Sequence, residues 1–351
     1  MEFGTFSLMG YRQPGPTTRD LLHQCAEQTR LADEGGIGIA WFAEHHFSNY
    51  CVCPSPLMMA AYCAPQTKRI RLGSGVLVLP LYAPARLIAE IGMVDSLSEG
   101  RLVLGVGSGY QPSEFERFGI DLASAKERTE ELLGLIETAL TEEYVEHHGK
   151  HFRLPRTHIS ARPYRGLPPI WITGESPQSQ AFAAQRGYPI FINGRFNNAD
   201  KLAARRPELE SVLVEQGKDP AALRWALLRF CCVTNSKSDA LDYAENARYQ
   251  LRLAGAERRG EIVVDGHIRD ASKPAPNEPS IEDIAASQMI GDVDTCIERG
   301  VEEIRKVRPS HIAMYFQLGN YDHKRAMRSL EAFVSRVIPG IEKELGPLSA
   351  L

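Results

Sequence analysis

The sequence has no long hydrophobic run and no excess of basic residues. Its longest apolar stretches reach about eight residues, far fewer than the roughly 20 that a membrane-spanning helix needs. The N-terminus, Met-Glu-Phe-Gly, lacks the basic and apolar regions of a signal peptide. The formal net charge is −4, which does not favour nucleic-acid binding. We therefore expect a cytoplasmic protein that binds neither membranes nor nucleic acids.

Cysteine is scarce and irregularly spaced. The chain has seven cysteines, an odd number, and none of them shows the CxxC spacing typical of a zinc site. Cys51 and Cys53, and the adjacent Cys231 and Cys232, are the closest pairs. The sequence thus predicts reduced thiols, no disulfide framework and no metal site.

What the sequence does have is a regular alternation of two kinds of segment. Of its 351 residues 43% are hydrophobic and 24% charged, which is ordinary for a globular protein. Short, almost continuously apolar runs occur at 3–8, 37–42, 70–79, 102–106, 170–173, 190–192, 225–233 and 312–316. Longer amphipathic stretches, typical of helices, occupy 17–35, 56–66, 84–97, 124–143, 177–186, 198–216, 237–253, 294–307 and 324–337.

Strands that alternate with helices indicate βαβ units and a parallel sheet. Eight such units predict a closed (β/α)8 TIM barrel, with residues 1–351 as a single domain. A doubly wound open sheet is the rival fold, but no GxGxxG follows the first strand. Two segments interrupt the repeat: 147–169, an excursion before strand five, and 255–291, which is either a lid over the active site or a passive surface loop.

The carboxyl ends of the strands carry the active site in such barrels. The second strand ends in Glu44-His45-His46, the most polar of these ends. A histidine titrates near neutrality and can shuttle a proton, so this pair is a catalytic candidate. The alternative is a structural histidine pair beside a carboxylate.

The fifth strand is followed by a pattern that suits phosphate. Ser176 is a good N-cap and Pro177 a good first helical residue, so free backbone N–H groups and the helix dipole would face an anion, with Ser179 nearby. The same pattern also fits an ordinary capped helix. Glycines in 105–110 would let a ligand approach the backbone, and Gly73-Ser74-Gly75 indicates a bulge or contact with something flat. Together these features fit a planar, phosphorylated cofactor.

Four segments carry a resemblance to a known family. Segments 41–47 (WFAEHHF), 72–80 (LGSGVLVLP), 95–101 (DSLSEGR) and 104–107 (LGVG) resemble motifs of the bacterial-luciferase-like flavin monooxygenases, and the match covers nearly the whole chain. The resemblance implies that His45 is the catalytic histidine near the flavin C4a position. It implies a cis peptide bond at Gly75–Val76, on which the flavin ring packs.

The remaining site residues also follow from the resemblance. The cofactor-binding positions that it implies, besides Gly75 and Val76, are Gly107, Ser108, Tyr110, Glu175, Ser176 and Ser179. Many relatives carry arginine where this chain has Ser108, and that arginine pairs with the flavin phosphate. Either Arg195 or an arginine of segment 255–291 replaces it, or the flavin binds only in its reduced form. Asp95, Ser98 and Arg101 match the family as a structural network around a helix turn.

The reaction implied is that of a two-component monooxygenase. A separate reductase supplies FMNH2, O2 adds to it to form a flavin C4a-(hydro)peroxide, and one oxygen atom is inserted into a small organic substrate. The resemblance also implies a homodimer packed around the helices at 56–66 and 84–97. The alternatives are an F420-dependent oxidoreductase on the same barrel, a non-catalytic flavin-binding subunit, and a metal-dependent hydrolase that uses Glu44, His45 and His46.

Overall fold

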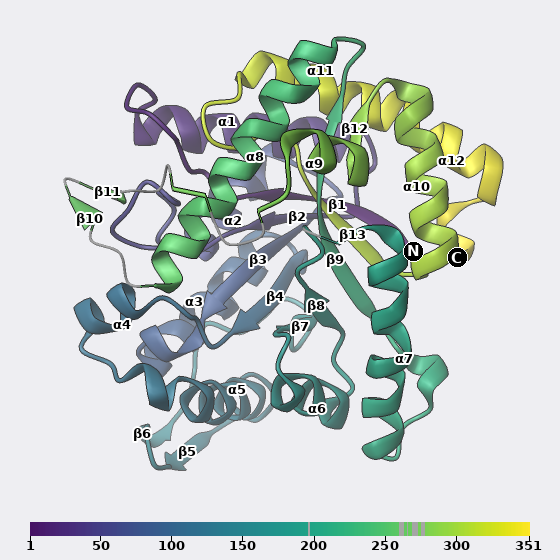
Figure 1. The fold of residues 1–351 in the computed structure, drawn as a ribbon. Helices are drawn as coiled ribbons and strands as arrows, with labels where there is room; N and C mark the ends of the chain where they lie inside the picture. Colours follow the sequence, from purple (N-terminus) through teal and green to yellow (C-terminus); the bar gives the residue numbers. More distant parts are fainter. Residues whose placement is uncertain (196, 260–262, 265, 269–272, 275–277) are drawn as a thin grey trace.

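The computed structural model describes residues 1–195, 197–259, 263–264, 266–268, 273–274 and 278–351. Its centre is a barrel of parallel strands that closes because β8 pairs with both β7 and β9 (Figure 1). The barrel strands are β1 (Glu2–Ser7), β2 (Ile39–Phe42), β3 (Arg71–Val78), β4 (Leu102–Gly107), β7 (Ile170–Thr173), β8 (Ile190–Ile192), β9 (Trp225–Val233) and β13 (His311–Tyr315). The predicted (β/α)8 barrel is confirmed, and the open-sheet alternative is wrong.

The predicted helices surround the barrel (Figure 1). They are α1 (Thr18–Glu34), α2 (Pro56–Cys63), α3 (Pro84–Leu97), α5 (Ala125–Thr141), α6 (Pro177–Arg186), α7 (Ala199–Glu215), α8 (Lys237–Arg258), α10 (Val293–Val307) and α11 (His323–Ala332). Their ends follow local chemistry: Thr17 forms a capping box with Asp20 at the start of α1, and Gly187 ends α6 in the left-handed conformation. A last helix, α12 (Ile338–Leu345), extends beyond the predicted one.

Several short elements were not predicted. The excursion at 147–169 contains most of an antiparallel hairpin, β5 (Val145–His148) and β6 (Arg153–Thr157), which lies against α5. Helix α8 runs five residues past its predicted end. Segment 255–291 contains β10 (Val263–Val264), β11 (His267–Ile268), α9 (Ile281–Ser287) and β12 (Met289–Gly291), while 260–262, 265, 269–272 and 275–277 fall outside the described residues. Between β4 and α5 stands a further short helix, α4 (Pro112–Phe118).

Aromatic rings fill the inside of the barrel. The Trp41 ring lies 5.9 Å from that of Trp171 and 5.4 Å from that of Phe191, and its indole N–H donates to His311 Nε2 at 2.8 Å. A Cβ on Gly73 would come within 2.4 Å of the Trp41 ring. The flat group expected against this glycine is therefore a core tryptophan. The bulge that Gly73-Ser74-Gly75 indicates is also present, as a register shift between β3 and β4 that follows Gly75.

The cysteines and Arg101 agree with the sequence-based expectations. All seven cysteines are buried and unbridged, and burial raises the pKa of Cys25 and Cys53 to about 12, so these thiols stay protonated. Arg101 donates to three backbone carbonyls and to Thr67, as a structural residue should. In the part of the chain that the structure describes, no helix combines the length and the apolarity required to cross a membrane.

A buried arginine on β9 holds the rim of the barrel together. Arg229 is 1% exposed and contacts Glu303, 4% exposed, with its Nη2 2.8 Å from Glu303 Oε2. The same guanidinium donates to the carbonyls of Gly194, Asn197 and Ser287. It thereby ties the loop after β8 to α9 and α10. Removal of Arg229 would leave the Glu303 carboxylate and the carbonyls of Asn197 and Ser287 without this partner, whereas the Gly194 carbonyl would keep the Asn197 backbone N–H.

We predict that Arg229→Met lowers the free energy of unfolding by about 3–5 kcal/mol, because it leaves Glu303 buried and uncompensated. Urea denaturation followed by circular dichroism measures the change. The double variant Arg229→Met, Glu303→Leu should recover part of the loss. Arg30→Met, which breaks an exposed pair with Glu34, is the control and should cost at most about 0.5 kcal/mol. Equal effects of Arg229→Met and Arg30→Met would contradict this role.

Candidate active site

His45 stands at the mouth of the barrel with a carboxylate behind it. Its Nδ1 lies 3.2 Å from Glu114 Oε1, and the Glu114 side chain, on α4, is only 1% exposed. The imidazole packs against two phenols, with ring centroids 4.6 Å from Tyr50 and 5.7 Å from Tyr110. A carboxylate at Nδ1 favours the tautomer with its proton on that atom. The lone pair on Nε2 is then available to accept a proton.

Behind this pair lies a buried polar network. In the amide orientation that satisfies its neighbours, Gln111 donates to Glu114 at 2.9 Å and to Glu257 at 3.0 Å, while its carbonyl accepts from His45 Nδ1. Ser48 also donates to Glu257, at 2.6 Å. Burial raises the pKa of Glu257, which is 2% exposed. The network fixes the His45 ring through contacts from three separate parts of the chain.

The neighbouring histidine has a different environment. His46 Nε2 lies 3.1 Å from Glu44, and its ring packs on Phe118. Glu44 is buried and accepts hydrogen bonds from Tyr82 Oη and the Val78 backbone, which tie the end of β2 to the end of β3. His46 thus pairs with Glu44, at the junction of β2 and β3, whereas His45 pairs with Glu114. Among the residues described, no cluster of three or more His, Cys, Asp or Glu side chains could hold a metal ion.

The peptide bond between Gly75 and Val76 is cis, as the resemblance implies. It lies on β3, and both residues are half-buried at the mouth. A Cβ on Gly75 would come within 2.8 Å of the Phe6 ring, and one on Gly107 within 3.1 Å of Val76. Glycine at these positions therefore leaves room for the Phe6 ring of β1 beside Gly75 and for the Val76 side chain beside Gly107.

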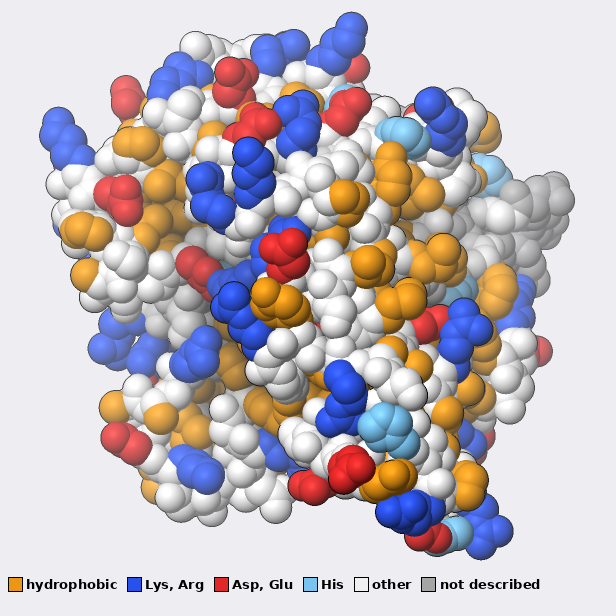
Figure 2. Space-filling view, turned by 180° about the vertical axis from the view of Figure 1, so that it is seen from behind, with side chains coloured by type: hydrophobic (Ala, Val, Ile, Leu, Met, Phe, Trp, Pro, Cys, Tyr) orange, Lys and Arg blue, Asp and Glu red, His pale blue; other side chains and the backbone are white. Residues whose placement is uncertain are grey.

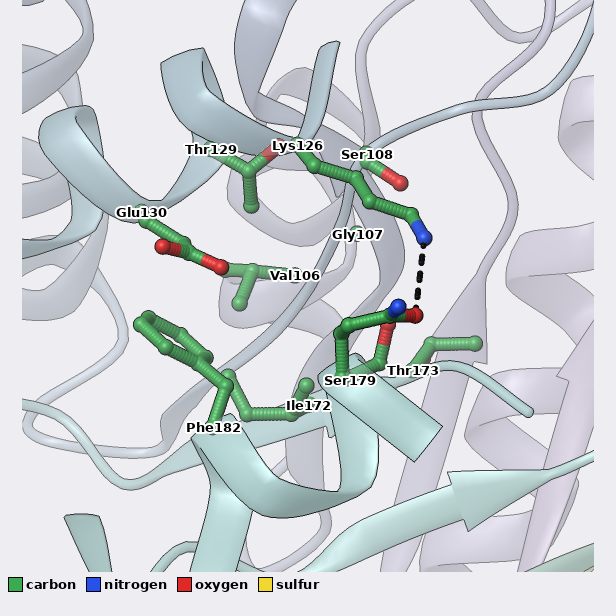
Figure 3. A pocket seen from close by; sticks show the side chains of 11 residues that line it. Val106, Gly107, Ser108, Lys126, Thr129, Glu130, Ile172, Thr173, Ser179 and Phe182 are labelled. Atoms are coloured by element: carbon green, nitrogen blue, oxygen red, sulfur yellow. Dashed lines mark hydrogen bonds between the residues drawn. The ribbon is translucent and has the colours of Figure 1, made fainter. Parts of the chain in front are cut away.

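A hollow opens between β4 and the start of α6 (Figure 3). It holds about 360 Å³, counting the solvent at its mouth. Ser176 caps α6 by accepting from the Ser179 backbone N–H, and the two hydroxyl oxygens lie 2.9 Å apart. A Cβ on Gly174 would come within 2.5 Å of Ser179, so only glycine permits this tight turn. Hydroxyls at the positive end of a helix dipole provide a chemistry that favours an anion.

The cation of this hollow is Lys126, from the first turn of α5. Figure 3 shows its side chain reaching toward Ser108 and the start of α6, where its ammonium lies 3.3 Å from Gln178 Oε1. Glu130 lines the opposite end of the hollow. Arg195, the expected replacement for the missing family arginine, does not line the hollow. Lysine binds phosphate as a point charge, so Lys126 can supply the positive charge that Ser108 lacks.

The start of segment 255–291 lies beside the mouth. Glu257 enters the His45 network, and the Arg258 guanidinium sits 4.7 Å from the centre of the Tyr110 ring. Gly266 accepts a hydrogen bond from the Asn49 backbone at 2.7 Å, in the loop that follows β2. The described parts of the segment therefore contact the residues that surround His45.

The structure brings most of the predicted site residues together, in two groups. His45, Gly75, Val76 and Tyr110 lie at the mouth. Ser108 and Ser179 line the hollow, Ser176 contacts Ser179 from behind it, and Gly107 lines the hollow and lies against Val76. Glu175 is exposed and accepts from the Asn193 backbone, which links the loops after β7 and β8. Sequence reasoning missed Lys126, Gln111, Glu114 and Glu257. For three of these a signal existed, since they lie within 20 residues of the end of β4; for Glu257 there was none.

Comparisons with known proteins agree with this geometry. The family described as luciferase-like monooxygenase matches residues 1–309. An "uncharacterized protein" of Sinorhizobium fredii is 37% identical over 99% of each chain. The oxygenase component of a flavin-dependent trigonelline monooxygenase from Acinetobacter baylyi is 27% identical, over 98% of this chain and 96% of that one.

A solved structure extends the comparison to the fold. The oxygenating constituent of 3,6-diketocamphane monooxygenase from Pseudomonas putida, in complex with FMN, superimposes with a TM-score of 0.79. It is 22% identical and covers 97% of this chain and 98% of its own. The family match spans most of the chain, and one relative exceeds one third identity over nearly the full length. The chain therefore belongs to the luciferase-like monooxygenase family and is a flavin-dependent oxidoreductase.

Proposed function

We propose that the protein is the oxygenase component of a two-component FMN-dependent monooxygenase. It takes FMNH2 from a separate reductase and inserts one oxygen atom of O2 into a small organic substrate. The observation that carries this proposal is that Gly107 lines the hollow that contains Lys126 and also lies against Val76 of the cis bond, where a Cβ on Gly107 would come within 3.1 Å. An anion site next to accessible backbone suits a flavin mononucleotide, which has a phosphate and a flat ring system. The Acinetobacter relative is itself named as an oxygenase component.

The residues present fit both ends of the cofactor. Lys126, Ser176 and Ser179 would hold the phosphate, and the platform of Gly75 and Val76 would carry the flat ring system. When bound, the reduced flavin supplies the electrons that activate O2. The protein's share is to bind, orient and protect that reactive group.

His45 supplies proton control in this proposal. Its Nδ1 proton is held by Glu114 and Gln111, so Nε2 is the atom that can take or return a proton at the mouth. Tyr50 and Tyr110 pack around the ring and limit the entry of water. We also propose that segment 255–291 acts as a lid, because its described parts already touch the residues around His45.

We predict that His45→Ala abolishes the protection of reduced flavin. The wild-type protein, mixed anaerobically with FMNH2 and then with O2, should slow the return of oxidised-flavin absorbance relative to free FMNH2. Loss of the proton donor and acceptor should speed that return by about 100-fold and release hydrogen peroxide. His148→Ala, an exposed histidine on β5, is the control and should behave as wild type.

Two results would contradict the proposal. One is reoxidation at the free-flavin rate in both wild type and His45→Ala. The other is tight binding of reduced F420 with no binding of FMNH2, which would favour hydride transfer, since F420-dependent enzymes share this fold. Slow reoxidation that His45→Ala leaves unchanged would instead indicate a flavin-binding subunit without a catalytic histidine.

We predict that Lys126→Met weakens FMN binding by about tenfold or more, because a charge-assisted bond to phosphate is lost. Riboflavin, which has no phosphate, should bind wild type and variant equally. Titration calorimetry with both ligands measures the difference. Lys150→Met, an exposed lysine on the β5–β6 hairpin, serves as the control. An equal loss of affinity for riboflavin would place Lys126 elsewhere than at the phosphate.

We also propose a homodimer through α2 and α3. These helices expose four large apolar side chains: Met58, Tyr62, Met93 and Leu97, at 74%, 44%, 51% and 58%. Hydrophobic side chains gather over this face in the space-filling view (Figure 2). Contiguous exposed apolar groups of this kind are typical of protein interfaces.

A double variant, Met93→Glu with Leu97→Glu, should convert the dimer to a monomer, because it would bury carboxylates in an apolar interface. Light scattering coupled to size-exclusion chromatography should then give half the wild-type mass. Val214→Glu, at an exposed site on α7, should leave the mass unchanged. A monomeric wild-type protein would refute the proposal.

A further inference from the structure

Arg195 is a buried cation at the mouth of the barrel. It follows β8, and the residue is 8% exposed. Asn193 Oδ1 accepts from its Nε at 2.9 Å and from its backbone N–H at 3.1 Å. Gln288, itself 1% exposed, donates to the Arg195 carbonyl at 3.1 Å. The position and the plane of the guanidinium are therefore fixed by the fold.

The outer part of this guanidinium has no counter-charge. Among the described residues the groups that act on its charge are phenols and not carboxylates, with Tyr50 and Tyr315 within hydrogen-bond reach, and its buried Nη1 has no hydrogen-bond partner. Arginine stays charged at all physiological pH values. A buried donor without an acceptor is unfavourable in the free protein. A ligand that accepts a hydrogen bond from Nη1 would remove this cost.

The surroundings of Arg195 supply donors and aromatic walls. Its guanidinium carbon lies 6.0 Å from the centre of the Tyr315 ring, and the phenols of Tyr50 and Tyr110 lie on the same side, with their oxygens 3.4 Å apart. Burial raises the pKa of Tyr110 and Tyr315 above the usual value, so both phenols remain protonated. The guanidinium and the phenol hydroxyls can all donate hydrogen bonds to an anion, and the tyrosine rings would surround that anion with flat, apolar faces.

This site is separate from the phosphate hollow. Neither Arg195 nor any of its three tyrosines lines the hollow, which has its own cation in Lys126. The tyrosines do surround His45, since Tyr50 and Tyr110 pack on its ring. An anion held by Arg195 would therefore lie close to the proposed proton-transfer group, at the reacting end of the cofactor and away from its phosphate end.

We propose that Arg195, with Tyr50, Tyr110 and Tyr315, binds a carboxylate of the substrate, so that the protein acts on small organic acids. The Nη1 group of Arg195, which has no partner, can donate to a carboxylate, the planar anion whose geometry a guanidinium matches. This inference rests on the proposed function, because it assigns the anion to the compound that is oxygenated.

Binding of simple acids to the flavin-free protein tests the proposal. Acetate, succinate, benzoate and nicotinate are titrated by calorimetry against acetamide, succinamide, benzamide and nicotinamide, their uncharged counterparts, and against phenylphosphonate. We expect at least one acid to bind roughly tenfold or more tightly than its amide. Arg195→Met should remove that preference, and Arg195→Lys should restore only part of it, because an ammonium lacks the planar fork. Arg224→Met, an exposed arginine beside Trp171, should change nothing.

Several results would overturn this assignment. They are acids and amides that bind equally, an unchanged preference in Arg195→Met, or phenylphosphonate that binds tenfold better than every acid. A loss of FMNH2 binding in Arg195→Met, with no loss of acid binding, would assign the cation to the flavin. The titrations need neither flavin nor O2, so they can succeed where the His45 experiment fails, and the two failures stay distinguishable.

Discussion

The arrangement of the mouth depends on one buried ion pair, that between Arg229 and Glu303. Buried charges are costly unless they are paired, and the Arg229 guanidinium is paired with Glu303 and with carbonyls of the loop after β8 and of the end of α9. The loop cannot shift without exposing these groups to an apolar interior. Arg229 donates to the carbonyl of Gly194, the residue that directly precedes Arg195. The backbone at Arg195 is thereby fixed.

Side-chain packing inside the barrel also holds the residues of the mouth in position. Trp41 and Trp171 fill its interior, and glycine on β3 makes room for the Trp41 ring. A dense aromatic interior resists deformation, so the strand ends above it keep their positions. Rigid strands then present short loops, and the chemistry is distributed over those loops: His45 after β2, Gln111 and Glu114 after β4, and Arg195 after β8.

Charge divides the site into two parts. One is an exposed lysine at the start of α5, suited to the phosphate that anchors a flavin; the other is a buried arginine among phenols, suited to a second anion. The Gly75–Val76 bond lies against Gly107 of the hollow, and the His45 ring packs on Tyr110. In the proposed function, this division would let binding energy come from both anions.

The sequence by itself determined the order of elements, since apolar runs and amphipathic periods come from interactions within a few residues, and every predicted barrel strand is present. It also determined the family, through motifs that include His45 and the Gly75–Val76 bond. Pairings between distant residues were decided only by tertiary structure: Glu114 lies 69 positions from His45, and Glu257 lies 209 from Ser48. No local pattern encodes such contacts, because they exist only once the barrel closes and brings its strand ends together. For the same reason the sequence offered Arg195 or an arginine of segment 255–291 in place of the arginine missing at Ser108, while the closed barrel places Lys126 at the hollow.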